Sequence, residues 1–217
     1  MTFSEENYLK AIYHLSTFDE AEVSTNAIAE MMDTKASSVT DMLKKLAEKE
    51  LVYYKKYQGA SLTEKGRLMA KMIVRKHRLW EVFLVEKLDF TWDEVHDVAE
   101  QLEHIRSEKL IDKLDDFLGH PTEDPHGDPI PDGNGQMVKV DKVLLSDLKE
   151  NQTGICVGVK DTSAEFLQYL DRQGIALGSK IKIVAIEPFD LSVIIKIDKK
   201  QVIVSDKTAT NLYVKLG

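Results

Sequence analysis

The sequence predicts a mostly helical N-terminal part, residues 1–118, followed by a small all-β barrel, residues 137–217. Up to residue 118, apolar residues recur at intervals of three and four, the period of an amphipathic α-helix. After residue 136 they occur in short alternating runs rich in β-branched residues, the pattern of strands. Between these parts, residues 119–136 hold four of the 5 prolines and four of the 11 glycines, so no helix or central strand is expected there.

The helical part is expected to begin with three short helices and a hairpin. The first helix covers residues 4–16 with Ser4 as its N-cap, the second begins near Ser24, and the third covers residues 36–52. Aromatic and β-branched residues with a turn near Gly59 then predict a two-stranded hairpin. Thr63 caps a long helix over residues 63–88, and two further helices are predicted over residues 92–105 and 107–118.

The β part contains five short runs that are typical of strands. They cover residues 153–159, 179–187, 191–198, 200–206 and 212–216, and one amphipathic helix is predicted over residues 163–173. Short strands at this spacing favour a small antiparallel barrel. The lone Cys156 lies in the first of these runs, where a buried structural thiol is expected rather than a nucleophile.

Composition and charge narrow the class of protein. No apolar run approaches the ~20 residues of a membrane span, no secretory signal is visible, and a single cysteine fits a reducing cytoplasm. The net charge of −8 argues against nucleic acid, but its distribution is uneven: residues 35–87 hold 13 basic and 6 acidic residues. A basic segment in an acidic chain is a local electrostatic surface for an anionic partner.

A short helix, a tight turn, a second helix and a hairpin follow one another in the order of a winged helix-turn-helix, which binds duplex DNA. The start of the second helix, "TKASSVT", supplies small hydroxyl side chains and nearby lysines that suit phosphates and base edges. Alternatively, these serines cap a helix and the lysines form a solvated face, but the hairpin favours DNA. The residues expected to contact DNA are Lys35, Ser37, Ser38, Thr40, Lys44, Lys55 and Lys56.

The stretch "HDVAEQLEHIRSE", residues 96–108, concentrates carboxylates and imidazoles. At roughly 100° per residue, His96, Glu100, Glu103 and His104 fall at roughly 0°, 40°, −20° and 80° around a helix axis, which is one face. A solvated surface with Glu–His pairs is one interpretation, and half of a metal site is the other. Carboxylates with an imidazole suit Mn²⁺ or Fe²⁺, while Zn²⁺ or Co²⁺ would also bind in vitro.

The whole chain resembles the diphtheria-toxin-repressor family of metal-dependent transcriptional regulators, which includes iron-dependent regulators and manganese transport regulators. The resemblance rests on "ENYLKAIYHL", "SSVTDMLKKL", "LTEKGRLMA", "RKHRL", "VHDVAEQLEHIRSE" and "DPHGDPIP", which occur in the family's order. It implies a dimer with four segments: a winged helix-turn-helix domain over 1–64, a helical dimerisation and metal-binding domain over 65–118, a Pro/Gly linker over 119–136, and an SH3-like (FeoA-like) domain over 137–217.

The resemblance also implies two metal sites. The family's primary ligands fall on Asn7, Glu100, Glu103 and His104, and the second set falls on His77, Glu81, His96 and, from the SH3-like domain, Glu165. Two positions depart from the manganese-type pattern. Asn7 stands where an Asp is usual, and Lys10 stands where a Glu is usual.

These expectations describe a cytoplasmic homodimer, activated by Mn(II) or Fe(II), that represses metal-uptake genes by binding palindromic operator DNA. Neither a membrane nor a small-molecule substrate is expected as a partner, and the chain is not expected to be an enzyme. One alternative is a winged helix-turn-helix regulator gated by a non-metal effector. Another is a metal-dependent enzyme, which is disfavoured because "HExxH" and paired Glu-x-x-His helices are absent.

Overall fold

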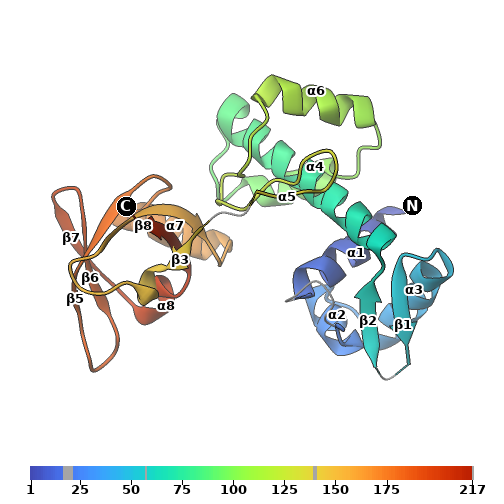
Figure 1. The fold of residues 1–217 in the computed structure, drawn as a ribbon, viewed down its shortest axis with the longest axis horizontal. Helices are drawn as coiled ribbons and strands as arrows, with labels where there is room; N and C mark the ends of the chain where they lie inside the picture. Colours follow the sequence, from blue (N-terminus) through green and yellow to red (C-terminus); the bar gives the residue numbers. More distant parts are fainter. Residues whose placement is uncertain (17–21, 57, 139–140, 217) are drawn as a thin grey trace. The chain divides into compact units, whose positions relative to one another are not determined.

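The computed structural model describes residues 1–16, 22–56, 58–138 and 141–216 of the chain (Figure 1). These residues form two compact units. The first contains Met1–Arg78, Glu100–Asp112 and Pro131–Met137, and the second contains Leu79–Ala99, Lys113–Ile130 and Val138–Gly217. Three continuous helices, α4 (Glu64–Leu88), α5 (Val95–Leu102) and α6 (Glu108–Leu118), contribute residues to both units.

Three helices open the first unit: α1 (Phe3–Leu15), α2 (Thr25–Met31) and α3 (Ala36–Glu48). The predicted start of α2 near Ser24 is confirmed, and the Ser24 hydroxyl caps the helix by accepting from the Ala27 amide. The predicted N-cap of α1 is wrong by two residues. Thr2 caps α1 in place of Ser4, because Thr2 and Glu5 form a reciprocal capping box that satisfies two amide donors at the helix start.

The predicted hairpin follows α3. Strands β1 (Val52–Lys55) and β2 (Gly59–Leu62) are antiparallel, with Val52 opposite Leu62 and Lys55 opposite Gly59. The helix–turn–helix–hairpin order is therefore confirmed. Its members share one buried core, to which α1 contributes Leu9 and Ile12 and α3 contributes Leu43. Helices α1 and α3 are thus linked through packed side chains.

The helical region ends with α4, α5 and α6 (Glu108–Leu118). The lengths of α4 and α6 match the prediction, but α5 is shorter than the expected 92–105. The Thr91 amide donates to the Glu94 carboxylate before the helix begins, and the chain turns after Leu102, whose carbonyl accepts from the Ile105 amide. Glu103 and His104 therefore lie in the turn after α5, so the regular helical face expected for them is not formed.

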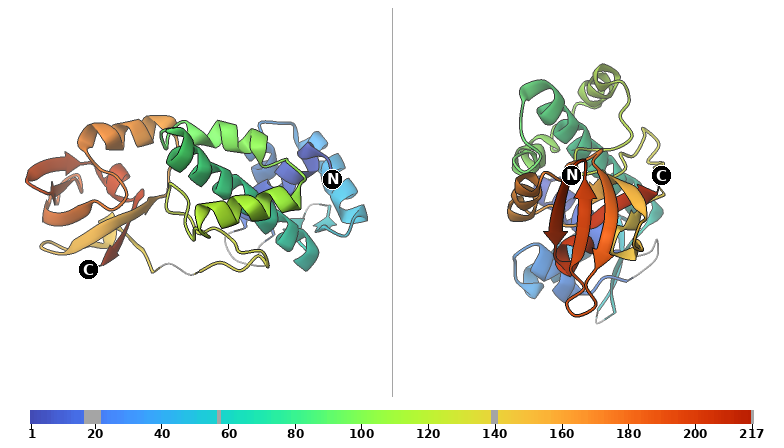
Figure 2. Two further views of the ribbon diagram at one scale, coloured as in Figure 1. Left: turned by 90° about the horizontal axis from the view of Figure 1, so that it is seen from above. Right: turned by 90° about the vertical axis from the view of Figure 1, so that its left-hand side faces the viewer.

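The second unit contains a six-stranded antiparallel sheet in the order β3-β8-β4-β5-β6-β7, whose strands lie side by side in Figure 2. The strands are β3 (Val143–Leu144), β4 (Thr153–Val159), β5 (Lys180–Ile186), β6 (Val193–Ile197), β7 (Lys200–Val204) and β8 (Leu212–Leu216). Among the described residues, β3 and β7 are the edge strands and do not pair with each other. The sheet therefore does not close into the predicted barrel.

The helix predicted over residues 163–173 of this domain is confirmed as α7 (Ala164–Gln173). A second, shorter helix, α8 (Asp206–Ala209), was not predicted. Leu167 and Leu170 of α7 are fully buried in the same core as Ile181 and Ile183 of β5, so α7 covers apolar surface that barrel closure would otherwise bury. No described helix of either unit has the length and apolar character of a membrane span.

Candidate metal centre

Glu103 is the centre of a charged cluster in the first unit. Its carboxylate is fully buried, and it contacts His77 Nδ1 at 2.7 Å and Lys10 Nζ at 2.8 and 2.9 Å. Burial alone would raise the pKa of Glu103, but the hydrogen bond with His77 and the charge of Lys10 outweigh it and lower that pKa. Glu103 is therefore ionised at neutral pH and supplies a buried negative charge.

His104 is held beside Glu103 by a residue that sequence reasoning missed. Nδ1 of His104 lies 2.6 Å from Glu6 Oε2, and the ring stacks on Phe3 with centroids 4.5 Å apart. Nε2 of His104 lies 3.9 Å from Glu103 Oε1. A carboxylate on one ring nitrogen directs the other nitrogen as a ligand, so Glu6 orients His104. The only signal in the sequence was the position of Glu6 next to Asn7.

Asn7 lies on α1, and its Oδ1 atom is buried without a hydrogen-bond partner. An unsatisfied buried acceptor is costly unless something electropositive occupies its vicinity. From the same helix, Lys10 reaches Glu100 Oε1 at 3.1 Å as well as Glu103, so α1 and the end of α5 meet at these charges. An amide oxygen, two carboxylates and an imidazole are donor types that suit a hard divalent cation. Among the described residues, however, Glu100, Glu103 and His104 are not one of the groups whose potential ligand atoms all lie within 4.8 Å of one another.

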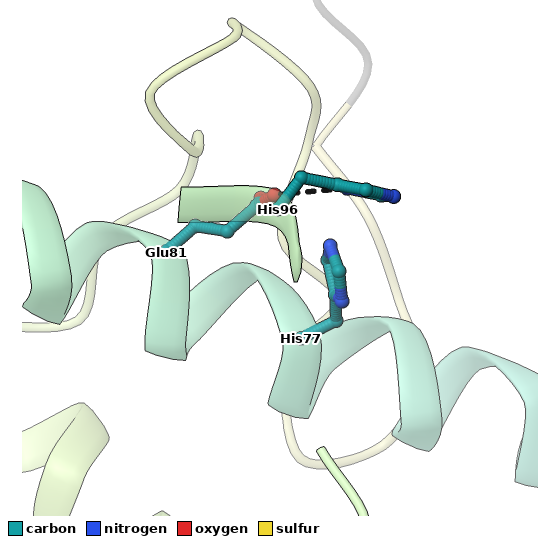
Figure 3. A group of neighbouring side chains, drawn as sticks. All are labelled: His77, Glu81 and His96. Atoms are coloured by element: carbon teal, nitrogen blue, oxygen red, sulfur yellow. Dashed lines mark ion pairs between the residues drawn. The ribbon is translucent and has the colours of Figure 1, made fainter. Parts of the chain in front are cut away.

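A second group joins His77, Glu81 and His96, as the resemblance implied (Figure 3). His77 and Glu81 are one turn apart on α4, and both side chains point to the side of the helix where His96 lies. Nδ1 of His96 lies 3.6 Å from Glu81 Oε1, and one potential ligand atom from each residue lies within 4.8 Å of the others. His77 also contacts Glu103, so its ring belongs to both clusters.

Glu81 belongs to another group, entirely within the second unit, that sequence reasoning did not predict. Potential ligand atoms of Glu81, Asp124 and His126 lie within 4.8 Å of one another, and all three residues are buried. His126 lies in a turn of the segment predicted as a linker, with its Nε2 2.7 Å from the Trp92 carbonyl and its Nδ1 3.8 Å from Glu81. The alternation of Asp and His in "EDPHGD" was the available signal.

Charge and backbone geometry fix His126 in this position. Burial would lower the pKa of His126, but the hydrogen bond and charge of Glu81 outweigh it and raise that pKa. The His126 carbonyl accepts from the Val159 amide of β4 at 3.0 Å. At Gly127, where φ is +80°, a Cβ would lie 1.8 Å from the Val157 carbonyl oxygen, so only glycine allows the linker to approach β4 this closely.

Glu165, the ligand expected from the SH3-like domain, lies on the exposed first turn of α7. It is not a member of either group of clustered ligand atoms found among the described residues. Of the eight metal ligands that the sequence suggested, the structure thus gathers His77, Glu81 and His96 in one cluster. It places Glu100, Glu103 and His104 around Lys10 and Glu6 in another.

The residues expected to contact DNA lie on α3 and the hairpin. Ser37 and Ser38 are exposed in the first turn of α3, which begins after Lys35. Lys44 is exposed about two turns further along the helix. Lys44 pairs with Asp41 at 3.2 Å, and the Thr40 hydroxyl donates to the Ala36 carbonyl at 3.0 Å. At the hairpin, Lys55 ends β1 and Lys56 follows it, and both are exposed.

Comparisons with known proteins agree with this arrangement. The family model of the iron dependent repressor N-terminal DNA binding domain matches residues 1–60, and that of the iron dependent repressor metal binding and dimerisation domain matches residues 63–132. The FeoA domain model matches residues 143–216. The chain is 37% identical over 127 residues to the iron-dependent repressor IdeR of Mycobacterium tuberculosis, a match covering 58% of this chain and 54% of that relative. The chain thus spans about half the length of the first such relatives.

Other relatives are covered more completely. The regulator MntR of Oceanobacillus iheyensis is 35% identical over 123 residues, which are 57% of this chain and 82% of MntR. A solved manganese-dependent transcriptional repressor in complex with manganese is 35% identical with a TM-score of 0.87, and the match covers 98% of this chain and 100% of the other. The manganese regulator SloR matches with a TM-score of 0.77 and 35% identity over 100% of both chains. The chain therefore belongs to the diphtheria-toxin-repressor family of metal-dependent transcriptional regulators, as its motifs predicted.

Proposed function

We propose that this chain is a homodimeric repressor that binds palindromic operator DNA of metal-uptake genes in the cytoplasm when Mn(II) or Fe(II) is plentiful. One observation supports this most directly. The buried carboxylate of Glu103 meets α1 through Lys10, and α1 packs its Leu9 and Ile12 into the core that also holds α3. Charge at the end of α5 is thereby connected to the helix expected to enter the major groove.

Asn7, Glu100, Glu103 and His104 are the residues that we propose to hold the activating ion. A divalent cation supplies the positive charge that two neighbouring carboxylates need. Glu103 provides a buried anionic donor, Glu6 directs His104, and Asn7 offers an amide oxygen that has no other partner. Because no thiol or thioether is among these donors, the set favours Mn²⁺ or Fe²⁺, and Zn²⁺ or Co²⁺ would also bind in vitro.

A second ion is proposed to bind around Glu81, which is shared by two clusters. The buried donors of Asp124 and His126 cluster with Glu81, so they are proposed to complete the set of His77, Glu81 and His96. Glu165, the residue suggested by the sequence, is the alternative fourth ligand. At the DNA, we propose that Ser37, Ser38, Thr40 and the basic side chains of Lys35 and Lys44 contact the major groove and its phosphates. Lys55 and Lys56 would contact phosphates from the hairpin.

The test is binding to DNA from upstream of the chain's own coding region, titrated with Mn²⁺ and with Fe²⁺. Glu103→Gln removes the buried charge with little change of shape, so metal-dependent binding should weaken on the order of a hundredfold. Glu5→Gln is the matched control, because Glu5 is also a buried carboxylate paired with a lysine, at 2.7 Å from Lys49. It should retain the full metal response.

DNA binding that does not depend on any metal would instead support a regulator gated by a different effector. Equal responses of Glu103→Gln and Glu5→Gln would remove Glu103 from the metal site.

A further inference from the structure

Lys10 holds an unusual position for a lysine. Its ammonium group contacts both oxygens of Glu103, at 2.8 and 2.9 Å, and Oε1 of Glu100 at 3.1 Å. The Lys10 side chain is only 13% exposed, and the carboxylate of Glu103 is not exposed at all. This is a desolvated, multiply bonded charge pair, which differs from the mobile ion pairs of a protein surface.

The Lys10 ammonium neutralises the charge of Glu100 and Glu103, the carboxylates that are proposed to hold the activating ion. All three oxygens that it contacts are the anionic donors of that site, and its own helix also carries the unpartnered oxygen of Asn7. Two cations within a few ångströms of one buried carboxylate repel each other strongly, because little water screens them. Lys10 and a divalent ion therefore cannot both be satisfied by Glu103.

We propose that Lys10 is a tethered competitor for the activating metal: its ammonium pairs with Glu100 and Glu103 until a divalent ion displaces it. The proposal rests on the proposed function, since it concerns the same carboxylates. Part of the free energy of metal binding is spent on breaking these contacts, so Lys10 raises the metal concentration at which the site fills. It also keeps the two carboxylates from repelling each other before metal arrives.

Other groups around Glu103 do not replace Lys10 in this role. His77 contacts Glu103 Oε2 through Nδ1 at 2.7 Å, but an imidazole is a cation only when it is protonated. His104 faces Glu103 Oε1 at 3.9 Å and has Glu6 on its other nitrogen. Lys10 is thus the group with a permanent positive charge in direct contact with both Glu100 and Glu103 among the pairs that the structure describes.

The experiment measures Mn²⁺ affinity in the full-length protein, without DNA, by competition with a fluorescent chelator. Lys10→Met removes the charge and keeps most of the apolar stem, so Mn²⁺ should bind on the order of tenfold more tightly. Lys49→Met is the matched control. It also removes one positive charge and an ion pair to a buried carboxylate of α1, Glu5, but that pair is not part of the proposed site. Its Mn²⁺ affinity should equal that of the unchanged protein.

Thermal unfolding gives a second readout. Without metal, Lys10→Met should unfold at a lower temperature than the unchanged protein, and saturating Mn²⁺ should raise its melting temperature by a larger increment. If Lys10→Met does not fold without metal, Lys10→Gln leaves a neutral donor to Glu103 and has the same expected gain in affinity.

Unchanged or weaker Mn²⁺ binding in the Lys10 variants would overturn the proposal. That result differs from failure of the proposed function, in which the unchanged protein itself does not bind Mn²⁺ or does not respond to it on DNA. Mn²⁺ binding that is tighter in Lys10→Met and Lys49→Met alike would also overturn it, because the gain would then come from overall charge.

Discussion

At the scale of single residues, Glu103 and Asn7 differ in what they would offer to a metal ion at the proposed site. Glu103 is buried yet ionised, because His77 and Lys10 compensate the loss of water around its carboxylate. Asn7 is neutral, and its buried oxygen has no compensating donor. A ligand with a charge attracts a divalent ion more strongly than a dipole does, so the identity of residue 7 should set the affinity.

Asn7→Asp should therefore tighten Mn²⁺ binding on the order of tenfold, since it adds a charged oxygen at nearly the same place. Isothermal titration of the two proteins with Mn²⁺ measures the change. Asn26→Asp, on the exposed face of α2, adds the same charge elsewhere and should leave the affinity as it was. An equal or weaker affinity in Asn7→Asp would show that this oxygen does not contact the ion.

For the proposed metal site, the sequence indicated which residues carry ligand chemistry, but it did not indicate which residues contact them. Glu100, Glu103 and His104 were recognisable because they are close in the chain and carry ligand chemistry. The pairings of Glu6 with His104 and of Lys10 with Glu103 join residues 98 and 93 positions apart, and no local pattern specifies such contacts. Asp124 and His126 were missed because the Pro/Gly segment looked like a linker, whereas Gly127 allows it to pack closely on β4.

At the scale of elements, the core beneath α3 and the hairpin leaves the residues that we propose to contact DNA exposed. Val39, Leu43 and Leu46 of α3 are buried, which leaves the opposite face with Ser37, Ser38 and Lys44 exposed. Lys44 shares its charge with Asp41 at 3.2 Å, an exposed pair that contributes little to stability. Replacing Lys44 should thus affect binding to DNA far more than folding.

Lys44→Ala should weaken DNA binding and reduce the slope of log K against log salt by about 0.9 for each phosphate that the variant no longer neutralises. Lys113→Ala is a matched control, because Lys113 on α6 is also exposed and pairs with an Asp three residues away, at 2.8 Å. The control should keep the original slope. If Lys44→Ala keeps the slope but discriminates less between operator and random DNA, Lys44 contacts a base edge instead.

Helix and strand positions followed from local periodicity, but the closure of the sheet did not. The run 153–159 was predicted correctly as β4, with Cys156 buried inside it at 1% exposure. Closure depends on whether edge strands meet, and here α7 supplies Leu167 and Leu170 to the core instead. A pattern that alternates in the same way is compatible with either arrangement.

Burial in this sheet raises the pKa of the Cys156 thiol to about 11. Because the thiolate is the reactive form, Cys156 should react with an aromatic disulfide reagent at pH 8 at least about a hundredfold more slowly than the unfolded chain. The rate should rise with urea in step with the unfolding of the sheet, followed by tryptophan fluorescence or circular dichroism. Rapid labelling in the folded protein would show that β4 opens locally.

At the scale of the whole molecule, the second unit joins the SH3-like domain to residues from the helical region and the linker. Trp92 packs against the core of the sheet, and its indole nitrogen donates to Asp171 of α7 at 3.2 Å. Gln168 of α7 donates to Asp93 at 2.9 Å. The Trp92 carbonyl also forms a hydrogen bond with His126 Nε2. Trp92 therefore contacts both the core of the sheet and the cluster around Glu81.

Two truncated chains test which residues complete the second metal site. A chain ending at Met137 keeps Asp124 and His126 but lacks Glu165, and a chain ending at Gly119 lacks all three. Since Asp124 and His126 cluster with Glu81 while Glu165 is exposed on α7, the longer chain should still bind about two Mn²⁺ per chain and the shorter about one. Equilibrium dialysis with metal analysis measures both. The winged helix and the proposed primary site lie before residue 119, so each chain should remain dimeric and bind operator with metal.

His126→Gln and Glu165→Gln in the full-length protein separate loss of a ligand from loss of the domain. If Glu165→Gln and the Met137 chain both lose the second ion while His126→Gln keeps it, the ligand comes from the SH3-like domain after all.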